Sequence, residues 1–109
     1  MAPIIVFVTT ASKREAQRIV QTLLEQHLIA CANILGPTES HFWWQGKIAR
    51  AKEFLVIMKS DQKLFLKLSK AVKEAHSYDV PEIVAVPIEA GFKPYLEWLD
   101  GTLAKSGES

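Results

Sequence analysis

The sequence predicts an α+β domain in which a four-stranded antiparallel sheet carries two helices on one face and is followed by a third helix. Short apolar segments with strand character alternate with segments whose apolar residues recur at helical spacing. Two of the strand segments are adjacent and are joined by a Gln-Gly pair that suits a hairpin turn. Of the 109 residues, 49% are hydrophobic, which is typical of one packed domain.

The first strand and the first helix are expected at the N-terminus. Ile4 to Val8 is a continuous apolar segment rich in β-branched residues, which predicts a central strand buried on both faces. Ser12 and Glu15 then have the spacing of a capping box, in which the two side chains accept hydrogen bonds at a helix start. The helix that follows is amphipathic, with its apolar positions at Ala16, Ile19, Val20, Leu23 and Leu24.

A second strand is expected at Ile29 to Leu35, ended by a turn or kink at Gly36-Pro37. The next segment, Thr38 to Lys59, is expected to form a long hairpin with Gln45-Gly46 at its turn, because glycine takes the positive φ of a primed turn. The turn sets the register of the facing pairs. These pairs are Trp44 with Lys47, Trp43 with Ile48, Phe42 with Ala49, His41 with Arg50, and Glu39 with Lys52.

The second strand of this hairpin would have about a dozen residues, more than the usual maximum of about ten. A domain of this size can hardly cover such a strand. One interpretation is that a bulge bends the hairpin back over its own core. The other, which we favour, is that the aromatic tip extends beyond its own domain and is buried by another copy of the chain.

The remaining elements complete the fold. Ser60 or Asp61 can cap a second helix, and His76 falls at the end of that helix. After a loop at 76–82, Ile83 to Ile88 is an apolar strand whose proline at position 87 indicates a sheet edge or a bulge. Pro94 suits the first turn of a third helix. This order of elements is the ferredoxin-like, split βαβ order, and we place one domain at residues 1–104 and a frayed tail at 105–109.

Composition limits the classes of function. A net charge of +1 gives no electrostatic reason to expect nucleic acid or an acidic membrane surface as a partner. Cys31 is the lone cysteine and so cannot form a disulfide within the chain. The N-terminal apolar segment has neither the basic start nor the length of a targeting or membrane-spanning segment, and we therefore predict a cytoplasmic protein.

Candidate chemical groups are scattered, because no phosphate-binding loop, dinucleotide motif, or paired metal-ligand motif occurs. Cys31 is the softest metal ligand available, although a cysteine between alanines is commonly a small buried hydrophobic residue. The loop from His76 to Glu82 gathers an imidazole, a phenol and two carboxylates, which could bind a cation or move a proton. The same loop could also be a helix cap followed by a turn. If copies assemble about an axis, cysteine with imidazole favours copper or zinc.

Motifs spread over nearly the whole chain occur in the order and spacing of one known family. They are Cys31-Ala32-Asn33-Ile34, Ser40 with Trp44-Gln45-Gly46-Lys47, Glu53, Lys59, His76, Tyr78, Pro81-Glu82-Ile83 and Tyr95-Leu96-Glu97-Trp98. With these motifs the chain resembles CutA, the divalent-cation tolerance proteins. The resemblance implies a ferredoxin-like homotrimer, similar to the P-II signalling proteins, in which long hairpin strands pair with neighbouring subunits.

The resemblance also implies a role in tolerance of copper and other divalent cations. It makes Cys31 and His76 the first candidate copper ligands, with Glu82 as a helper, in a weak or regulatory site. The residues expected at a cleft between subunits are Phe42, Trp44, Lys59, Tyr78 and Trp98.

The chain departs from the family pattern at three positions. Phe42 replaces a usual tyrosine, and Ser77 replaces the proline of a His-Pro-Tyr motif, which makes the loop less rigid. Trp43 stands at a commonly polar position and predicts tighter packing between subunits at the tip.

We therefore expect a homotrimer that binds divalent metal, copper first, and is not an enzyme. The alternative is a P-II-like signalling or protein-anchoring module that binds a small molecule or a protein in its clefts without a metal role. An enzyme with Cys31 as nucleophile and His76 as base is disfavoured, because nothing in the sequence places the two within hydrogen-bonding reach.

Overall fold

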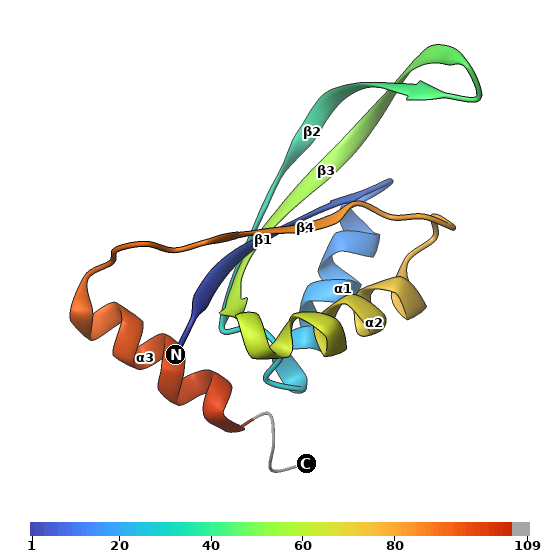
Figure 1. Cartoon of the computed structure of the whole chain (residues 1–109). Helices are drawn as coiled ribbons and strands as arrows, with labels where there is room; N and C mark the ends of the chain where they lie inside the picture. The colour runs from blue at the N-terminus through green and yellow to red at the C-terminus, as the bar shows by residue number, and fades with distance from the viewer. Residues whose placement is uncertain (106–109) are drawn as a thin grey trace.

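The computed structural model describes residues 1–105 and shows the predicted order of elements (Figure 1). Its strands are β1 (Pro3–Thr10), β2 (Cys31–Trp44), β3 (Lys47–Asp61) and β4 (Ile83–Pro87). Its helices are α1 (Lys13–Glu25), α2 (Phe65–Ala75) and α3 (Lys93–Leu103), with a short 3-10 turn, η1 (Gln62–Leu64), before α2. Residues 106–109, which belong to the predicted tail, lie outside the described part of the chain.

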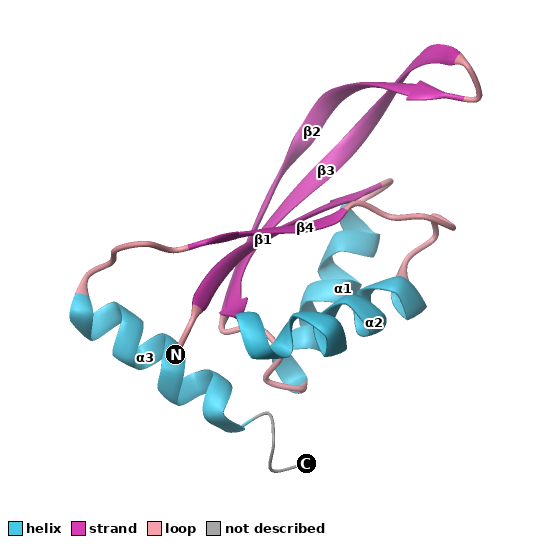
Figure 2. Cartoon of the chain, viewed as in Figure 1, coloured by secondary structure: helices cyan, strands magenta, loops and turns pink. Residues whose placement is uncertain are grey.

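The four strands form one antiparallel sheet in the order β2-β3-β1-β4 (Figure 2). This order confirms the predicted central position of β1 and the predicted edge position of the strand that contains Pro87. The prediction that β1 is buried on both faces is wrong for the single chain. Val6 and Val8 are fully buried, but Ile5 and Phe7 on the opposite face are only half-buried. The reason is that α1 and α2 cover one face of the sheet and leave the other open.

The hydrophobic core lies between the sheet and its helices. Its central residues come from β1, β3, α1, α2 and α3, and they include Val6, Val8, Ile19, Leu23, Val56, Met58, Leu68, Val72, Leu99 and Leu103. Period-two alternation places the residues of β1 and β3 on one face of the sheet, and helical spacing gathers the apolar residues of each helix on one side of it. Every one of these central residues has at most 2% of its surface exposed. The core therefore fixes the body of the molecule.

The long hairpin has the predicted turn and register. Gln45 and Gly46 both have positive φ, and the five predicted facing pairs are all present. The predicted end of the strand at Gly36-Pro37 is wrong, because β2 continues through this pair. The irregularity expected there is present as a shift of register between Leu35 and Thr38. One strand can absorb extra residues as a bulge while its partner stays continuous, which is why the turn-forming pair does not end the strand.

Beyond the bulge the hairpin becomes a two-stranded arm, defined here as residues 38–53. Of the β3 residues that pair with β1, the one nearest the arm is Phe54, which lies opposite Thr10. Figure 1 shows the arm extending away from the body, and the long dimension of the molecule is 44 Å. Trp43 is 73% exposed and Ile48 is 69% exposed. The arm therefore does not fold back over its own core, although the bulge of the alternative interpretation is present in β2.

The expected caps are present with one change of partner. The Ser12 hydroxyl accepts from the Glu15 amide at 3.1 Å, as in a capping box. Glu15 Oε1 accepts from the amide of Ala11 at 3.1 Å, one residue before the expected donor. Asp61 accepts from the Lys63 amide at 3.0 Å and caps η1. Pro94 lies in the first turn of α3, as predicted.

Candidate functional site

The predicted site residues fall into three separate groups in the single chain. The first group surrounds Cys31 at the end of the sheet far from the arm. The second surrounds His76 at the root of the arm, and the third is the aromatic tip. Each group is positioned by a different set of elements, so their contacts are described in turn.

Cys31 begins β2 on the open face of the sheet and is half-buried. Lys59 of β3 lies opposite it, as strand pairing requires. The hydroxyl of Tyr95, on α3, lies 3.3 Å from Cys31 Sγ, and the ring of Trp98 lies 5.5 Å from that of Tyr95. The hydrogen bond to Cys31 and burial together raise the pKa of Tyr95 to about 12. A soft sulfur and a phenol therefore meet at this position, beside the backbone of Lys59.

His76 follows α2, and its imidazole is completely buried. Nε2 lies 2.7 Å from the carbonyl oxygen of Thr9, which can only accept, so Nε2 carries the proton. Nδ1 accepts from the Tyr78 amide at 3.0 Å. The ring also lies against that of Tyr78, with 4.8 Å between centroids. Both ring nitrogens are therefore used within the chain, one with β1 and one with the loop that follows α2.

Two buried carboxylates hold the same loop. Glu15 is 4% exposed and its Oε2 accepts from the Ser77 amide at 2.6 Å. Burial raises the pKa of Glu15, but hydrogen bonds from Ser77 and Ala11, with the nearby His76, outweigh burial, so the pKa lies below its usual value.

The second of these carboxylates belongs to Glu53, which is 7% exposed. Its Oε2 accepts from the Tyr78 hydroxyl at 2.7 Å. Burial and this hydrogen bond raise the pKa of Tyr78 to about 12. The phenol therefore stays protonated and serves as a donor.

The candidate metal ligands are not brought together within one chain. Cys31 lies opposite Lys59, which pairs with Ile5, whereas His76 contacts Thr9. Ile5 and Thr9 lie roughly 13 Å apart along β1 at strand spacing, so the two candidate ligands are separated by about this distance.

Glu82, the third candidate ligand, is exposed and precedes β4 at the arm side of the sheet. Among residues 1–105, no three His, Cys, Asp or Glu side chains form a group that could hold a metal ion. The three candidate ligands therefore do not fit a common metal site in the single chain.

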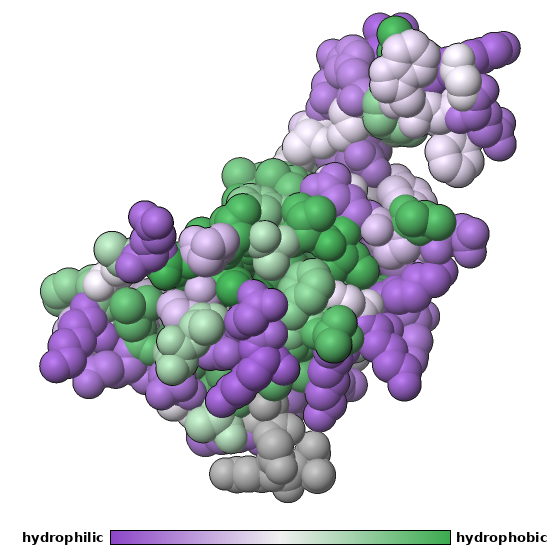
Figure 3. Space-filling view, in the orientation of Figure 1, coloured by the Kyte–Doolittle hydropathy of each residue, from purple (hydrophilic) through white to green (hydrophobic). Residues whose placement is uncertain are grey.

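The aromatic tip and the open sheet face expose apolar surface. Phe42 is 40% exposed and Trp44 is 61% exposed. Their face of the arm continues the open face of the sheet, because paired residues share a face and sides alternate along β3. Figure 3 shows hydrophobic side chains gathered over the middle of the body. The apolar residues of the open face are Ile5, Phe7, Leu35, Leu55, Ile57, Val84 and Val86.

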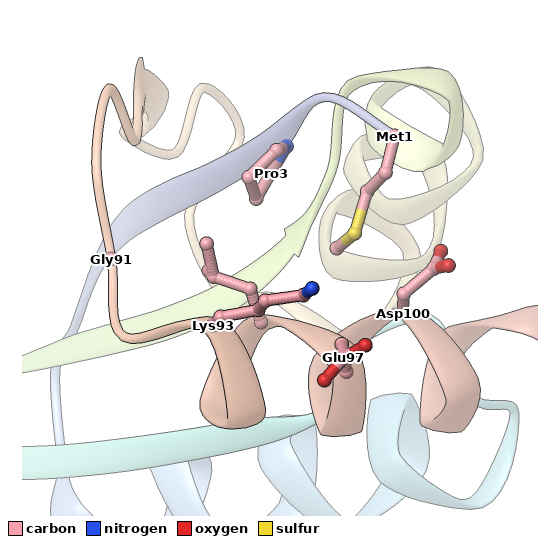
Figure 4. Close-up of a pocket in the computed structure, with 7 residues that line it drawn as sticks. Met1, Pro3, Gly91, Lys93, Glu97 and Asp100 are labelled. Atoms are coloured by element: carbon pink, nitrogen blue, oxygen red, sulfur yellow. The ribbon is translucent and has the colours of Figure 1, made fainter.

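A shallow cleft lies elsewhere, between the N-terminal residues and α3. Figure 4 shows Met1 and Pro3 above the helix, with Lys93, Glu97 and Asp100 along it. None of the predicted site residues lines this cleft. This cleft is therefore separate from the three groups of predicted site residues.

Sequence reasoning did not assign three residues that the structure places in these groups. Tyr95 appeared in the family motifs without a role, and Glu15 was only a helix cap. Glu53 appeared in the family motifs without a role, although an acidic residue that alternates with Leu55 and Ile57 was a usable signal of a buried polar contact. The contacts of all three join segments that are far apart in the sequence.

The fold is shared with known structures. One solved structure is described as the periplasmic divalent cation tolerance protein CutA from Archaeoglobus fulgidus, with a TM-score of 0.90 and 44% identity. The match covers 93% of this chain and 98% of that one. A relative from Oryza sativa subsp. japonica, described as chloroplastic CutA 1, is 40% identical over 94% of this chain. The present chain spans 58% of the length of that plant relative.

These descriptions contradict the prediction of a cytoplasmic location. The prediction relied on the lack of a recognisable targeting segment, which is weak information when a relative with the same fold is described as periplasmic. In the described residues, no helix has both the length and the apolar character needed to cross a membrane.

Sequence comparison identifies the family over nearly the whole domain. A curated divalent-cation tolerance protein CutA from Archaeoglobus fulgidus is 46% identical over 90% of this chain and 95% of its own length. The sequence model of one family matches residues 4–102. On this match, the chain belongs to the family of the CutA1 divalent ion tolerance protein.

Proposed function

We propose that this chain acts in divalent-cation tolerance as a homotrimer that binds divalent metal, copper first, weakly and at the subunit boundaries. The observation that carries the proposal is the position of Cys31 on the open face of the sheet. A second copy that covered this face would add its own side chains to the thiol. A thiolate is a soft ligand that favours copper and zinc over magnesium and calcium.

The exposed apolar surface supports the assembly. The open sheet face and the tip carry large apolar side chains, among them Val84 (49% exposed), Leu35 (46%) and Trp44 (61%). Contiguous apolar surface of this kind marks an interaction site in a folded protein. Because one face of the arm continues the open face of the sheet, a neighbouring copy could cover both at once.

The contributions of the three candidate ligands are expected to be unequal. His76 could reach an ion only if a buried hydrogen bond to Thr9 or Tyr78 opened. Glu82 is exposed and could contact an ion as a second ligand from its own or another copy. We therefore expect the thiol of Cys31 to contribute most of the affinity.

Calorimetric titration with Cu²⁺, and with Zn²⁺ to avoid oxidation of the thiol, tests the metal role. Substitution of the thiol by a hydroxyl, Cys31→Ser, should weaken binding at least tenfold. Glu82→Gln should have a smaller effect, and Glu89→Gln, which changes another exposed carboxylate, is the matched control. Binding by Cys31→Ser equal to wild type, or no binding by wild type where a small-molecule chelator binds, would contradict the proposal.

A second candidate function is a P-II-like signalling or protein-anchoring module. It is favoured by the observation that His76 and Tyr78 use their polar atoms within the chain, which leaves shape and aromatic surface to recognise a partner. A crystal structure of the assembled protein purified without added ligand separates the two functions. Density for an organic molecule between Trp44 and the Tyr78 loop would support the second.

A further inference from the structure

We propose that the hydrogen bond between Tyr78 and Glu53 is a tether that fixes the direction of the arm relative to the body. Its consequence for assembly rests on the proposed homotrimer, because the direction of the arm determines how the tip meets a neighbouring copy. The tether itself is a property of the single chain.

Glu53 occupies the position at which the arm loses the support of the sheet. Phe54, the next residue along the chain, is the β3 residue nearest the tip that still pairs with β1. From Glu53 to the tip, β3 pairs only with β2. A two-stranded ribbon has little stability or stiffness of its own. The register shift between Leu35 and Thr38 lies directly opposite, so the ribbon also changes its pairing here.

The tether is a strong hydrogen bond between a half-buried phenol and a buried carboxylate. The Tyr78 hydroxyl donates to Glu53 Oε2 at 2.7 Å, and Glu53 is 7% exposed. A hydrogen bond to a carboxylate is stronger than a neutral one, and a low-dielectric surrounding strengthens it further. Among the side-chain hydrogen bonds of residues 1–105, it is the only one that joins the arm to the body.

The other end of the tether is anchored to two elements of the body. The Tyr78 amide donates to His76 Nδ1 at 3.0 Å, and His76 Nε2 donates to the Thr9 carbonyl of β1 at 2.7 Å. The Ser77 amide donates to Glu15 of α1 at 2.6 Å. The phenol therefore extends from a segment that β1 and α1 hold in place. Its hydrogen bond to Glu53 fixes the root of the arm relative to these two elements.

A small rotation at the root would produce a large displacement at the tip. Lys47 lies roughly 20 Å along β3 from Glu53 at strand spacing. A rotation of about 10° would move the tip by roughly 3.5 Å, which is enough to separate side chains that touch within about 4.5 Å. A tether at Glu53 therefore prevents the small rotations at the root that would displace the tip by several ångströms.

Hydrogen exchange of backbone amides in the assembled protein tests the tether. Tyr78→Phe removes only the hydroxyl, and Glu53→Ala removes its acceptor. Each change should speed exchange in the arm about tenfold, without a matching change in β1. Glu53→Gln keeps an acceptor oxygen and should restore protection most of the way to wild type. Tyr95→Phe, which removes the hydroxyl beside Cys31, is the matched control and should leave the arm unchanged.

The same samples are weighed by native mass spectrometry during dilution. Under the proposal, Tyr78→Phe dissociates at about tenfold higher protein concentration than wild type. Equal exchange in the arms of Tyr78→Phe and Tyr95→Phe, or a rise that is as large in β1 as in the arm, would overturn the tether. A wild-type mass equal to one chain would instead overturn the homotrimer, while the comparison of exchange rates would still decide the tether.

Discussion

At the scale of single residues, Glu15 shows how one buried carboxylate can serve two segments. Its Oε1 accepts from the Ala11 amide before α1, and its Oε2 accepts from the Ser77 amide after α2. A buried charge is costly unless hydrogen bonds compensate it, and here two backbone donors do so. The side chain thus joins the start of one helix to the segment that follows the other.

The low pKa of Glu15 predicts a pH dependence of stability. Because the folded-state pKa lies below the usual 4.5, the charged form stabilises the fold above pH 4.5, and this contribution is lost as pH falls below 4.5. Glu15→Gln should lower the free energy of unfolding at pH 7. The difference from wild type should shrink below pH 4.5 in urea titrations at several pH values.

The matched control for this experiment is Glu25→Gln, an exposed carboxylate of the same helix. It should change the free energy of unfolding by less than about 0.5 kcal/mol, as is usual for a surface substitution. A difference between Glu15→Gln and wild type that stays constant from pH 7 to pH 3 would contradict the assigned role.

At the scale of elements, the bulge in β2 decides the shape of the hairpin. Gly36 has φ +149°, a conformation that side-chain-bearing residues rarely adopt. A Cβ atom there would lie 2.7 Å from Cδ2 of Phe54 and 3.1 Å from the Glu53 carbonyl oxygen. Glycine is therefore required both by the backbone and by the close approach of β3.

Gly36→Ala should consequently destabilise the protein by about 1–3 kcal/mol, since it adds strain and a contact with Phe54. Thermal or urea unfolding measures the effect. Gly101→Ala is the matched control, because its added Cβ would meet nothing within 4 Å and alanine is the better helix former within α3. Equal stability of Gly36→Ala and wild type would show that the bulge can rearrange without cost.

At the scale of the whole molecule, the chain leaves two large apolar surfaces uncovered: the open sheet face and the tip. Trp43 points to the other side of the arm from Trp44 and is 73% exposed. In a single chain, removal of the Trp43 side chain would lower the stability little, because an exposed side chain has few contacts to lose. An effect on stability would therefore indicate coverage by another copy.

Trp43→Ala should lower the melting temperature of the assembled protein, and the loss should depend on protein concentration, as mass action requires. The wild type should have a mass three times that of the 12.2 kDa chain in sedimentation equilibrium. Leu66→Ala, at an 83% exposed position of α2, is the control for loss of an exposed apolar side chain. An unchanged melting temperature for Trp43→Ala would count against tight packing between subunits at the tip.

The sequence by itself determined the elements and much of their arrangement. Local signals were sufficient for the hairpin register, the Ser12 cap, the start of α3 and the order of elements along the chain, because each depends on neighbouring residues or on the periodicity of apolar residues. The motifs of the chain also indicated the CutA family, which the comparisons confirm.

The tertiary structure alone decided which polar groups meet. His76 contacts Thr9, Tyr78 contacts Glu53, and Cys31 contacts Tyr95, across separations that no local pattern encodes. It also showed that β2 continues through its bulge, because a partner strand can hold together a segment that turn propensity alone would break. Side-chain contacts of this kind depend on how the sheet and helices pack in three dimensions, and so they lie beyond what spacing along the chain can predict.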